Sequence, residues 1–117
     1  MKADNVVQIK SYAFAIRIVK AYKYLVEEHK EYVLSKQLLR CGTSIGANIE
    51  EAIGGQSQKD FFAKLTIAYK EARETQYWLK LLRDTDYLTL EQSRSLIEDT
   101  EELLRIIGSI QKTIRNS

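Results

Sequence analysis

The feature that most constrains this 117-residue chain is that it contains no proline and only five glycines, which are confined to a few places. Helix-breaking residues are therefore scarce, and residues with high helix propensity dominate the stretches between them. No run of alternating β-branched residues interrupts this pattern. The sequence predicts four long helices, at residues 5–28, 35–53, 58–84 and 89–115.

Capping residues mark the connections between these helices. Ser35 is placed to cap the second helix and Gly54 to end it. Ser57 is placed to cap the third helix, and Thr89 forms a capping box with Gln92 at the start of the fourth. Because all three links are short, consecutive helices should be antiparallel neighbours. We expect an all-α, antiparallel up-down-up-down four-helix bundle that forms a single domain over residues 1–117.

Composition excludes several classes of protein. Apolar residues make up 44% of the chain, charged residues 29%, and the formal net charge is +2, which is typical of a globular protein and neither demands nor excludes binding of nucleic acid. No apolar run approaches the roughly 20 residues that span a membrane. The single cysteine, Cys41, has no intrachain partner for a disulfide, so we expect a cytoplasmic protein.

Residues that carry common catalytic chemistry are missing or isolated. The one histidine, His29, falls in a predicted loop far along the chain from Cys41, which argues against a nucleophile-base pair. A bundle-core di-iron site needs a Glu-x-x-His motif on each of two helices, and one histidine cannot supply it. No glycine-rich phosphate loop is present. We expect no enzymatic activity, no metal or other cofactor and no small-molecule substrate.

The third and fourth predicted helices each carry one apolar stripe with helical spacing. These stripes predict core residues, which are Phe61, Leu65, Ala68, Ala72, Leu79 and Leu82 on the third helix and Leu96, Leu103, Ile106 or Ile107, and Ile110 on the fourth. An acidic cluster in the first half of the fourth helix is expected to be a solvated face on the opposite side. Its members are Glu98, Asp99, Glu101 and Glu102.

The first predicted helix is apolar on two sides. One stripe comprises Phe14, Ile18, Ala21 and Leu25, and the other comprises Tyr12, Ile16, Val19, Tyr22 and Val26. A lone bundle buries only one side of each helix, so the second stripe predicts an interface with another subunit. The alternative is that the tyrosines lie half-exposed with their hydroxyls in water.

The second predicted helix carries a polar ridge beside its apolar face, formed by Arg40, Ser44, Asn48 and Glu51. Interhelical hydrogen bonds from Asn48 and Glu51 to Arg40 or Arg73 would explain the ridge structurally, and the alternative is that it binds a ligand or partner. Gly42 and Gly46 lie on a different side, where they should permit close approach by another helix. Both glycines are therefore added to the candidate subunit interface.

The first predicted helix also carries the densest group of basic residues, Lys10, Arg17, Lys20 and Lys23, with no acidic residue between positions 10 and 23. This group is a candidate RNA contact. A solvated polar strip or the rim of a subunit interface would explain the same residues.

Part of the sequence resembles a known family. The run from Gln37 to Glu51 and the segment from Lys59 to Leu79 are similar to the bacterial four-helix proteins encoded within intervening sequences of 23S ribosomal RNA genes. The resemblance covers residues 12–110, and Ala52 stands where the family has a glycine. The matching positions are Arg40, Ser44, Ile45, Asn48, Ile49, Glu51, Phe61, Leu65, Ala68, Ala72, Glu74 and Tyr77.

The resemblance implies a small four-helix bundle that assembles as a homopentameric ring. It also implies kinship with the accessory proteins of diversity-generating retroelements, which assist a reverse transcriptase and its RNA. Taken together, the sequence predicts a non-catalytic scaffold that associates with itself. An accessory protein that binds RNA or a ribonucleoprotein is the first alternative, and a protein-binding adaptor is the second.

Overall fold

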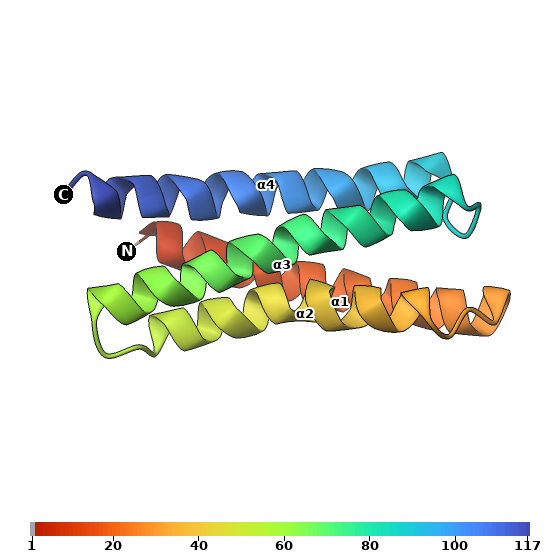
Figure 1. Ribbon diagram of the computed structural model, residues 1–117, viewed down its shortest axis with the longest axis horizontal. Coiled ribbons are helices and arrows are strands. Elements are labelled where there is room, and N and C mark those ends of the chain that lie inside the picture. Colours follow the sequence, from red (N-terminus) through yellow and green to blue (C-terminus); the bar gives the residue numbers. More distant parts are fainter. Residues whose placement is uncertain (1) are drawn as a thin grey trace.

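The computed structural model describes the backbone of residues 2–117 and the side chains of residues 6–117. It contains four helices, α1 (Lys2–His29), α2 (Leu34–Ile53), α3 (Gln58–Asp84) and α4 (Leu90–Arg115), and no strand within this range. Figure 1 shows α2, α3 and α4 side by side, with α1 behind them and each helix antiparallel to the one before it. The predicted up-down-up-down bundle is confirmed.

Each helix runs along most of the molecule. The 28 residues of α1 rise about 42 Å at 1.5 Å per residue, and the molecule measures 47 × 21 × 19 Å. The helix bounds agree with the predicted ones to within one residue, except that α1 begins at Lys2 rather than at residue 5.

Three of the predicted helix ends are confirmed. At the start of α3, Ser57 Oγ accepts a hydrogen bond from the Asp60 amide at 3.1 Å. At the start of α4, Thr89 and Gln92 exchange two hydrogen bonds in the predicted capping box, at 2.9 and 3.0 Å. Gly54 ends α2, and its amide donates to the Glu50 carbonyl at 3.1 Å.

The predicted cap of α2 is wrong. Ser35 lies inside the helix, fully buried, and its hydroxyl donates to the Glu31 carbonyl at 2.7 Å. The Glu31 carboxylate takes the role instead, because it accepts hydrogen bonds from the amides of Val33, Leu34 and Ser35 at 3.1, 2.9 and 2.7 Å. A buried acidic side chain thus satisfies three free amides at the positive end of the helix dipole.

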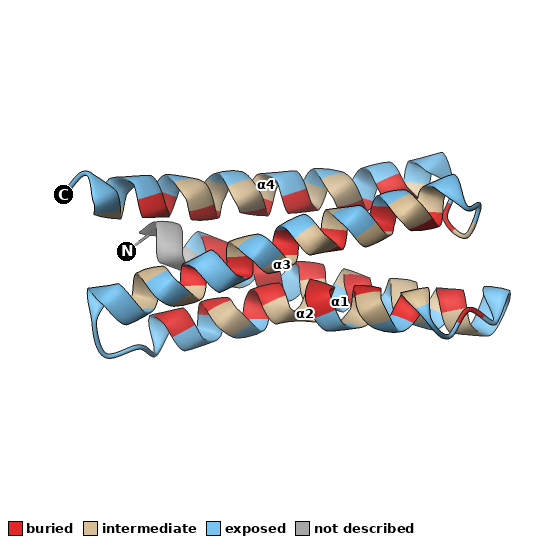
Figure 2. Cartoon of the chain, in the orientation of Figure 1, coloured by how far each residue is buried: buried red, intermediate tan, exposed pale blue. Residues whose placement is uncertain are grey.

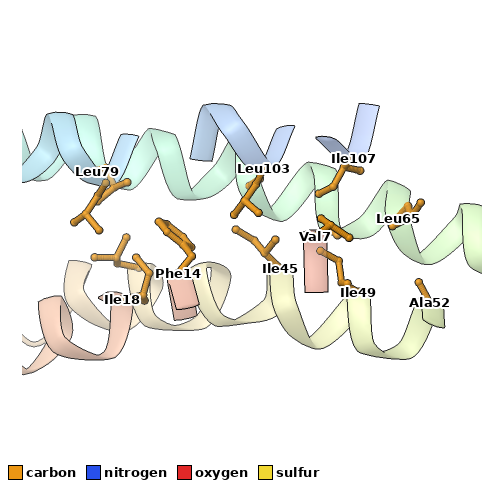
Figure 3. Close-up of a cluster of buried hydrophobic side chains, with 14 of the residues drawn as sticks. Val7, Phe14, Ile18, Ile45, Ile49, Ala52, Leu65, Leu79, Leu103 and Ile107 are labelled. Atoms are coloured by element: carbon orange, nitrogen blue, oxygen red, sulfur yellow. The ribbon is translucent and has the colours of Figure 1, made fainter. Parts of the chain in front are cut away.

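The core is a continuous apolar cluster along the axis of the bundle (Figure 3), and buried residues face inward on all four helices (Figure 2). The predicted core residues of α3 and α4 are buried, except that Phe61 and Ile106 are half-buried, and Ile107 takes the inner position. On α1, Phe14, Ile18 and Leu25 are buried as predicted, and Ala21 is half-buried.

The two glycines of α2 bring this helix close to α1. A Cβ atom built on Gly42 would lie 2.8 Å from side-chain carbons of Ile18, and one on Gly46 would lie 3.3 Å from the Ser11 carbonyl oxygen. Both glycines are buried. The expected close approach is therefore confirmed, but the approaching helix is α1 of the same chain.

We expect Leu79→Ala to lower the free energy of unfolding by about 2 to 5 kcal/mol, because Leu79 is fully buried and its loss leaves a cavity. Leu90→Ala is the matched control. Leu90 is 75% exposed, so its replacement should change stability by less than about 0.5 kcal/mol. Urea denaturation of both variants measures the difference, and equal losses would contradict the core assignment.

Glu31→Gln should destabilise the protein by about 1 to 2 kcal/mol at neutral pH, through loss of the charged cap. Burial raises the pKa of Glu31, but the hydrogen bonds from Leu34, Ser35 and Val33 outweigh it and hold the pKa below the ordinary 4.5. The stabilisation is therefore complete above about pH 4.5 and is lost as the pH falls through the folded-state pKa. Unfolding measured between about pH 7 and 3 should show wild type converging on the variant at low pH.

We expect Gly42→Ala to destabilise the protein by about 1 to 2 kcal/mol. The added methyl group overlaps Ile18, which is fully buried and cannot move aside freely, and this overpacking outweighs the gain in helix propensity. Gly54→Ala is the control, because its Cβ would make only ordinary contacts at 3.6 Å or more. Thermal unfolding compares the two, and a stable Gly42→Ala variant would show that α1 can move away from α2.

Candidate interaction surfaces

One side of α1 presents large apolar side chains to solvent. Ile9 and Tyr12 are 68% and 67% exposed, and Ile16 and Val19 are also exposed. We call these four residues the α1 outer face. Their spacing of three, four and three residues is that of the a and d positions of a coiled coil, the pattern by which one helix packs against another.

The structure separates the residues predicted for the subunit interface into three groups. Tyr12, Ile16 and Val19 are exposed, whereas Tyr22 and Val26 are half-buried within the chain. Gly42 and Gly46 lie against α1 of the same chain. Their predicted place in the subunit interface is therefore wrong, because residues covered inside the chain cannot meet another subunit. Ile9 was not predicted for the interface, although it continues the same stripe one turn earlier.

The polar ridge of α2 is tied to α3 through Arg40. Its guanidinium pairs with Glu71 at 3.3 Å and with Glu74. Glu74 also accepts a hydrogen bond from the Trp78 indole at 3.0 Å, and the Tyr77 ring packs edge-on against Trp78 with ring centres 5.1 Å apart. Arg40, Glu74 and Tyr77 of the family motif therefore belong to one linked cluster.

The other ridge residues do not join this cluster. The Asn48 amide donates to the Ser44 carbonyl of its own helix at 2.8 Å, and Glu51 pairs with Lys64 at 3.2 Å. The predicted hydrogen bonds from Asn48 and Glu51 to Arg40 or Arg73 are therefore wrong. The reason is height along the bundle, because Arg40 lies opposite Glu71 and Glu74, while Glu51 lies near the start of α3.

A second partly apolar strip runs along the outside of α3. Its residues recur at spacings of four and three, the same heptad pattern as on α1. Two of its members are exposed large hydrophobic residues, Ile67 at 41% and Tyr77 at 59%. We call the strip the α3 outer face, and it comprises Ala63, Ile67, Lys70, Glu74, Tyr77 and Leu81.

The basic residues of α1 are divided between ion pairs and solvent. Lys10 pairs with Glu102 at 3.2 Å, and Arg17 pairs with Asp99 and donates to Ser95 at 2.9 Å. Lys20 and Lys23 make no ion pair with any residue whose side chain the structure describes.

The predicted acidic face of α4 is wrong for two of its four residues. Asp99 and Glu102 lie toward α1, where Arg17 and Lys10 neutralise them. Glu98 and Glu101 are exposed as predicted. Asp99 and Glu102 therefore do not belong to the solvated face, because they lie on the side of α4 that borders α1.

An open groove of about 370 Å³ lies between α1 and α4 beside these ion pairs. Ala21, Leu88 and Leu96 form its apolar wall, and Arg17, Lys20 and Gln92 form its polar wall. Because Asp99 and Ser95 already occupy the Arg17 guanidinium, Lys20 is the one cation that the groove offers to an anion.

The isolated His29 and Cys41 stay apart from each other in the structure. His29 contacts Tyr24, with 3.1 Å between ring nitrogen and hydroxyl, and packs edge-on against Tyr87. Cys41 is fully buried, and this burial raises the pKa of its thiol to about 11, so the reactive thiolate is suppressed at neutral pH. The described residues form no cluster of metal ligands.

No helix in residues 2–117 is long and apolar enough to cross a membrane.

Comparisons with known proteins agree with the resemblance seen in the sequence. A family model described as "23S rRNA-intervening sequence protein" matches residues 3–109. A crystal structure of a protein with unknown function from the S23 ribosomal protein family of Bacteroides thetaiotaomicron VPI-5482 is similar, with a TM-score of 0.93 and 57% sequence identity. The match covers 94% of this chain and 98% of that chain. No curated protein matches this chain.

Proposed function

Since the chain belongs to the 23S rRNA-intervening sequence protein family, we propose that it is a non-catalytic scaffold that assembles with copies of itself into a homopentameric ring. The observation that carries the proposal is the α1 outer face, a heptad seam of exposed Ile, Tyr and Val side chains. Burying one such side chain is worth about 1 to 2 kcal/mol. Four in one row favour a helix from another chain.

The number five comes from the family resemblance, and the ring is the kind of assembly that repeats one contact between identical chains. The absence of a catalytic role is supported by the chemistry of the described residues. Cys41 is buried with a raised pKa, His29 is packed among tyrosines, and the carboxylates of Glu71 and Glu74 are held by Arg40.

Binding of RNA is the alternative function, and it now depends on fewer residues. Lys10 and Arg17 form ion pairs with acidic residues of α4. Of the four predicted RNA contacts, Lys20 and Lys23 therefore remain available. Two cations per chain would become ten in a ring of five, so an RNA contact would be a property of the assembly and would weaken steeply with salt.

Light scattering on a sizing column tests the proposal directly. We expect a mass about five times the 13.6 kDa of one chain, because ring closure satisfies every copy of the contact. We expect Ile16→Asp to reduce the mass toward that of one chain, since the variant replaces an apolar seam side chain with a charge that is costly to bury. Arg94→Glu, on the exposed side of α4, is the control and should leave the assembly unchanged.

A monomeric wild-type chain at all concentrations would refute self-assembly. Intact assembly of Ile16→Asp would show that the α1 outer face is not the contact. The same column run with total bacterial RNA at low and high salt separates the alternative, because only an RNA-binding assembly shifts at low salt and returns at high salt.

A further inference from the structure

If the chain self-assembles as proposed, a ring needs two different surfaces on each copy, because every subunit meets one neighbour on each side. The α1 outer face supplies one of them. The α3 outer face is the best candidate for the other, since Tyr77 is 59% exposed there and Ile67 41% exposed. The two faces belong to different helices, so the contact joins unlike surfaces.

The two faces have matching patterns. On α1, Ile9 and Val19 lie ten residues apart, and on α3, Ile67 and Tyr77 lie ten residues apart. Both pairs sit at seam positions of a heptad, where parallel helices interlock their side chains. α1 and α3 also run in the same direction within the bundle (Figure 1). A rotation about an axis along the bundle keeps that direction, so α1 of one copy is parallel to α3 of the next.

The faces also lie at corresponding heights. Val7 and Leu65 lie toward one end of the core, and Ile18 and Leu79 toward the other (Figure 3). Ile9 and Ile67, two residues further along their helices, therefore share the first end. Val19 and Tyr77 share the second, so no large shift along the axis is needed to join the two faces.

Part of each face borders α2. Tyr12 and Val19 lie within about 40° of Gln8 on the helix, at 100° per residue, and Gln8 donates to Glu50 of α2 at 2.9 Å. On α3, Glu74 pairs with Arg40 of α2. Copies joined through these parts of the two faces would curve with α2 inside and α4 outside.

The charged Glu74 of the α3 outer face is compatible with burial. Arg40 and the Trp78 indole already satisfy the Glu74 carboxylate, so its charge does not oppose an apolar neighbour. Trp78 also supports the Tyr77 ring edge-on. At the far end, Lys23 of α1 has no ion-pair partner among the described side chains and would come near Asp84, which is 64% exposed and pairs with its neighbour Arg83 at 2.7 Å.

We propose that the α1 outer face of one copy packs in parallel against the α3 outer face of a second copy, with Ile9 meeting Ile67 and Val19 meeting Tyr77. The assembly is heterologous, and each copy contributes a different helix to its two contacts. This arrangement rests on the self-assembly proposed above. It goes further because it specifies which surface of the second copy the α1 outer face contacts.

Mixing two variants tests the arrangement. Ile16→Asp damages only the α1 outer face and Tyr77→Asp only the α3 outer face, so each alone should give a single-chain mass in light scattering. An equal mixture retains one intact pair of faces, and we expect its mass to double. Assembly of Tyr77→Asp at the wild-type mass, or a mixture that stays at one chain, would overturn the proposal.

Disulfide cross-linking provides a second test that keeps the assembly whole. After oxidation, the double variant Val19→Cys/Tyr77→Cys should form a ladder of linked chains on a non-reducing gel. Ile9→Cys/Tyr77→Cys is the matched control, because its cysteines differ in height by ten residues, about 15 Å. Equal ladders in both, or linked dimers of the single variant Val19→Cys, would overturn the parallel pairing.

The two proposals fail in distinguishable ways. A wild-type chain that is monomeric in light scattering removes self-assembly itself. An assembled wild type in which Tyr77→Asp has no effect, and in which the Val19→Cys/Tyr77→Cys pair does not cross-link, leaves self-assembly standing and removes the pairing of α1 with α3.

Discussion

The contact between Ile18 and the bare backbone of α2 at Gly42 determines how α1 is turned about its own axis. Only a glycine leaves room for the Ile18 side chain at this distance, and Phe14 and Leu25 follow it into the core on the same stripe. Rotating α1 to cover its second stripe would expose these residues. The exposed α1 outer face is therefore a direct result of the packing that holds the bundle together.

The attachment of α1 to its two neighbours is unequal. Toward α2, the helix is held by close apolar packing around two glycines. Toward α4, it is held beside an open groove by the pairs of Lys10 with Glu102 and Arg17 with Asp99, which are roughly 40% exposed and worth about 0 to 1 kcal/mol each. The α1–α2 pair is therefore the firm side of the bundle, and α2 borders both of the surfaces proposed to meet other copies.

The features that sequence predicted well depend on residues close together along the chain. Helix lengths, the caps at Ser57 and Thr89 and the core stripes follow from local spacing. The cap of α2 was missed because Glu31 acts from four residues before Ser35, across a turn whose shape the sequence does not specify. The partners of Asp99 and Glu51 depend on which helices are neighbours and at what height, which no local pattern contains.

The candidate surfaces show the same division. Most of the α1 outer face was predicted from the sequence. Its apolar residues form a second stripe on a helix that already has one stripe for the core. The α3 outer face was not predicted, since Lys70 and Glu74 interrupt it and make it look like a solvated side. Only the structure shows that Arg40 takes up the charge of Glu74 and leaves Tyr77 supported by Trp78.

Trp78 is the only tryptophan of the chain, and it lies beside the α3 outer face with its indole bonded to Glu74 and its ring against Tyr77. All of the intrinsic tryptophan fluorescence therefore originates at one known place. The emission of unmodified protein can report the solvent and charge around that place, without a dye. Dissociation of the proposed assembly on dilution would change the surroundings of Trp78, so emission can test for it at nanomolar concentrations, far below those that light scattering requires.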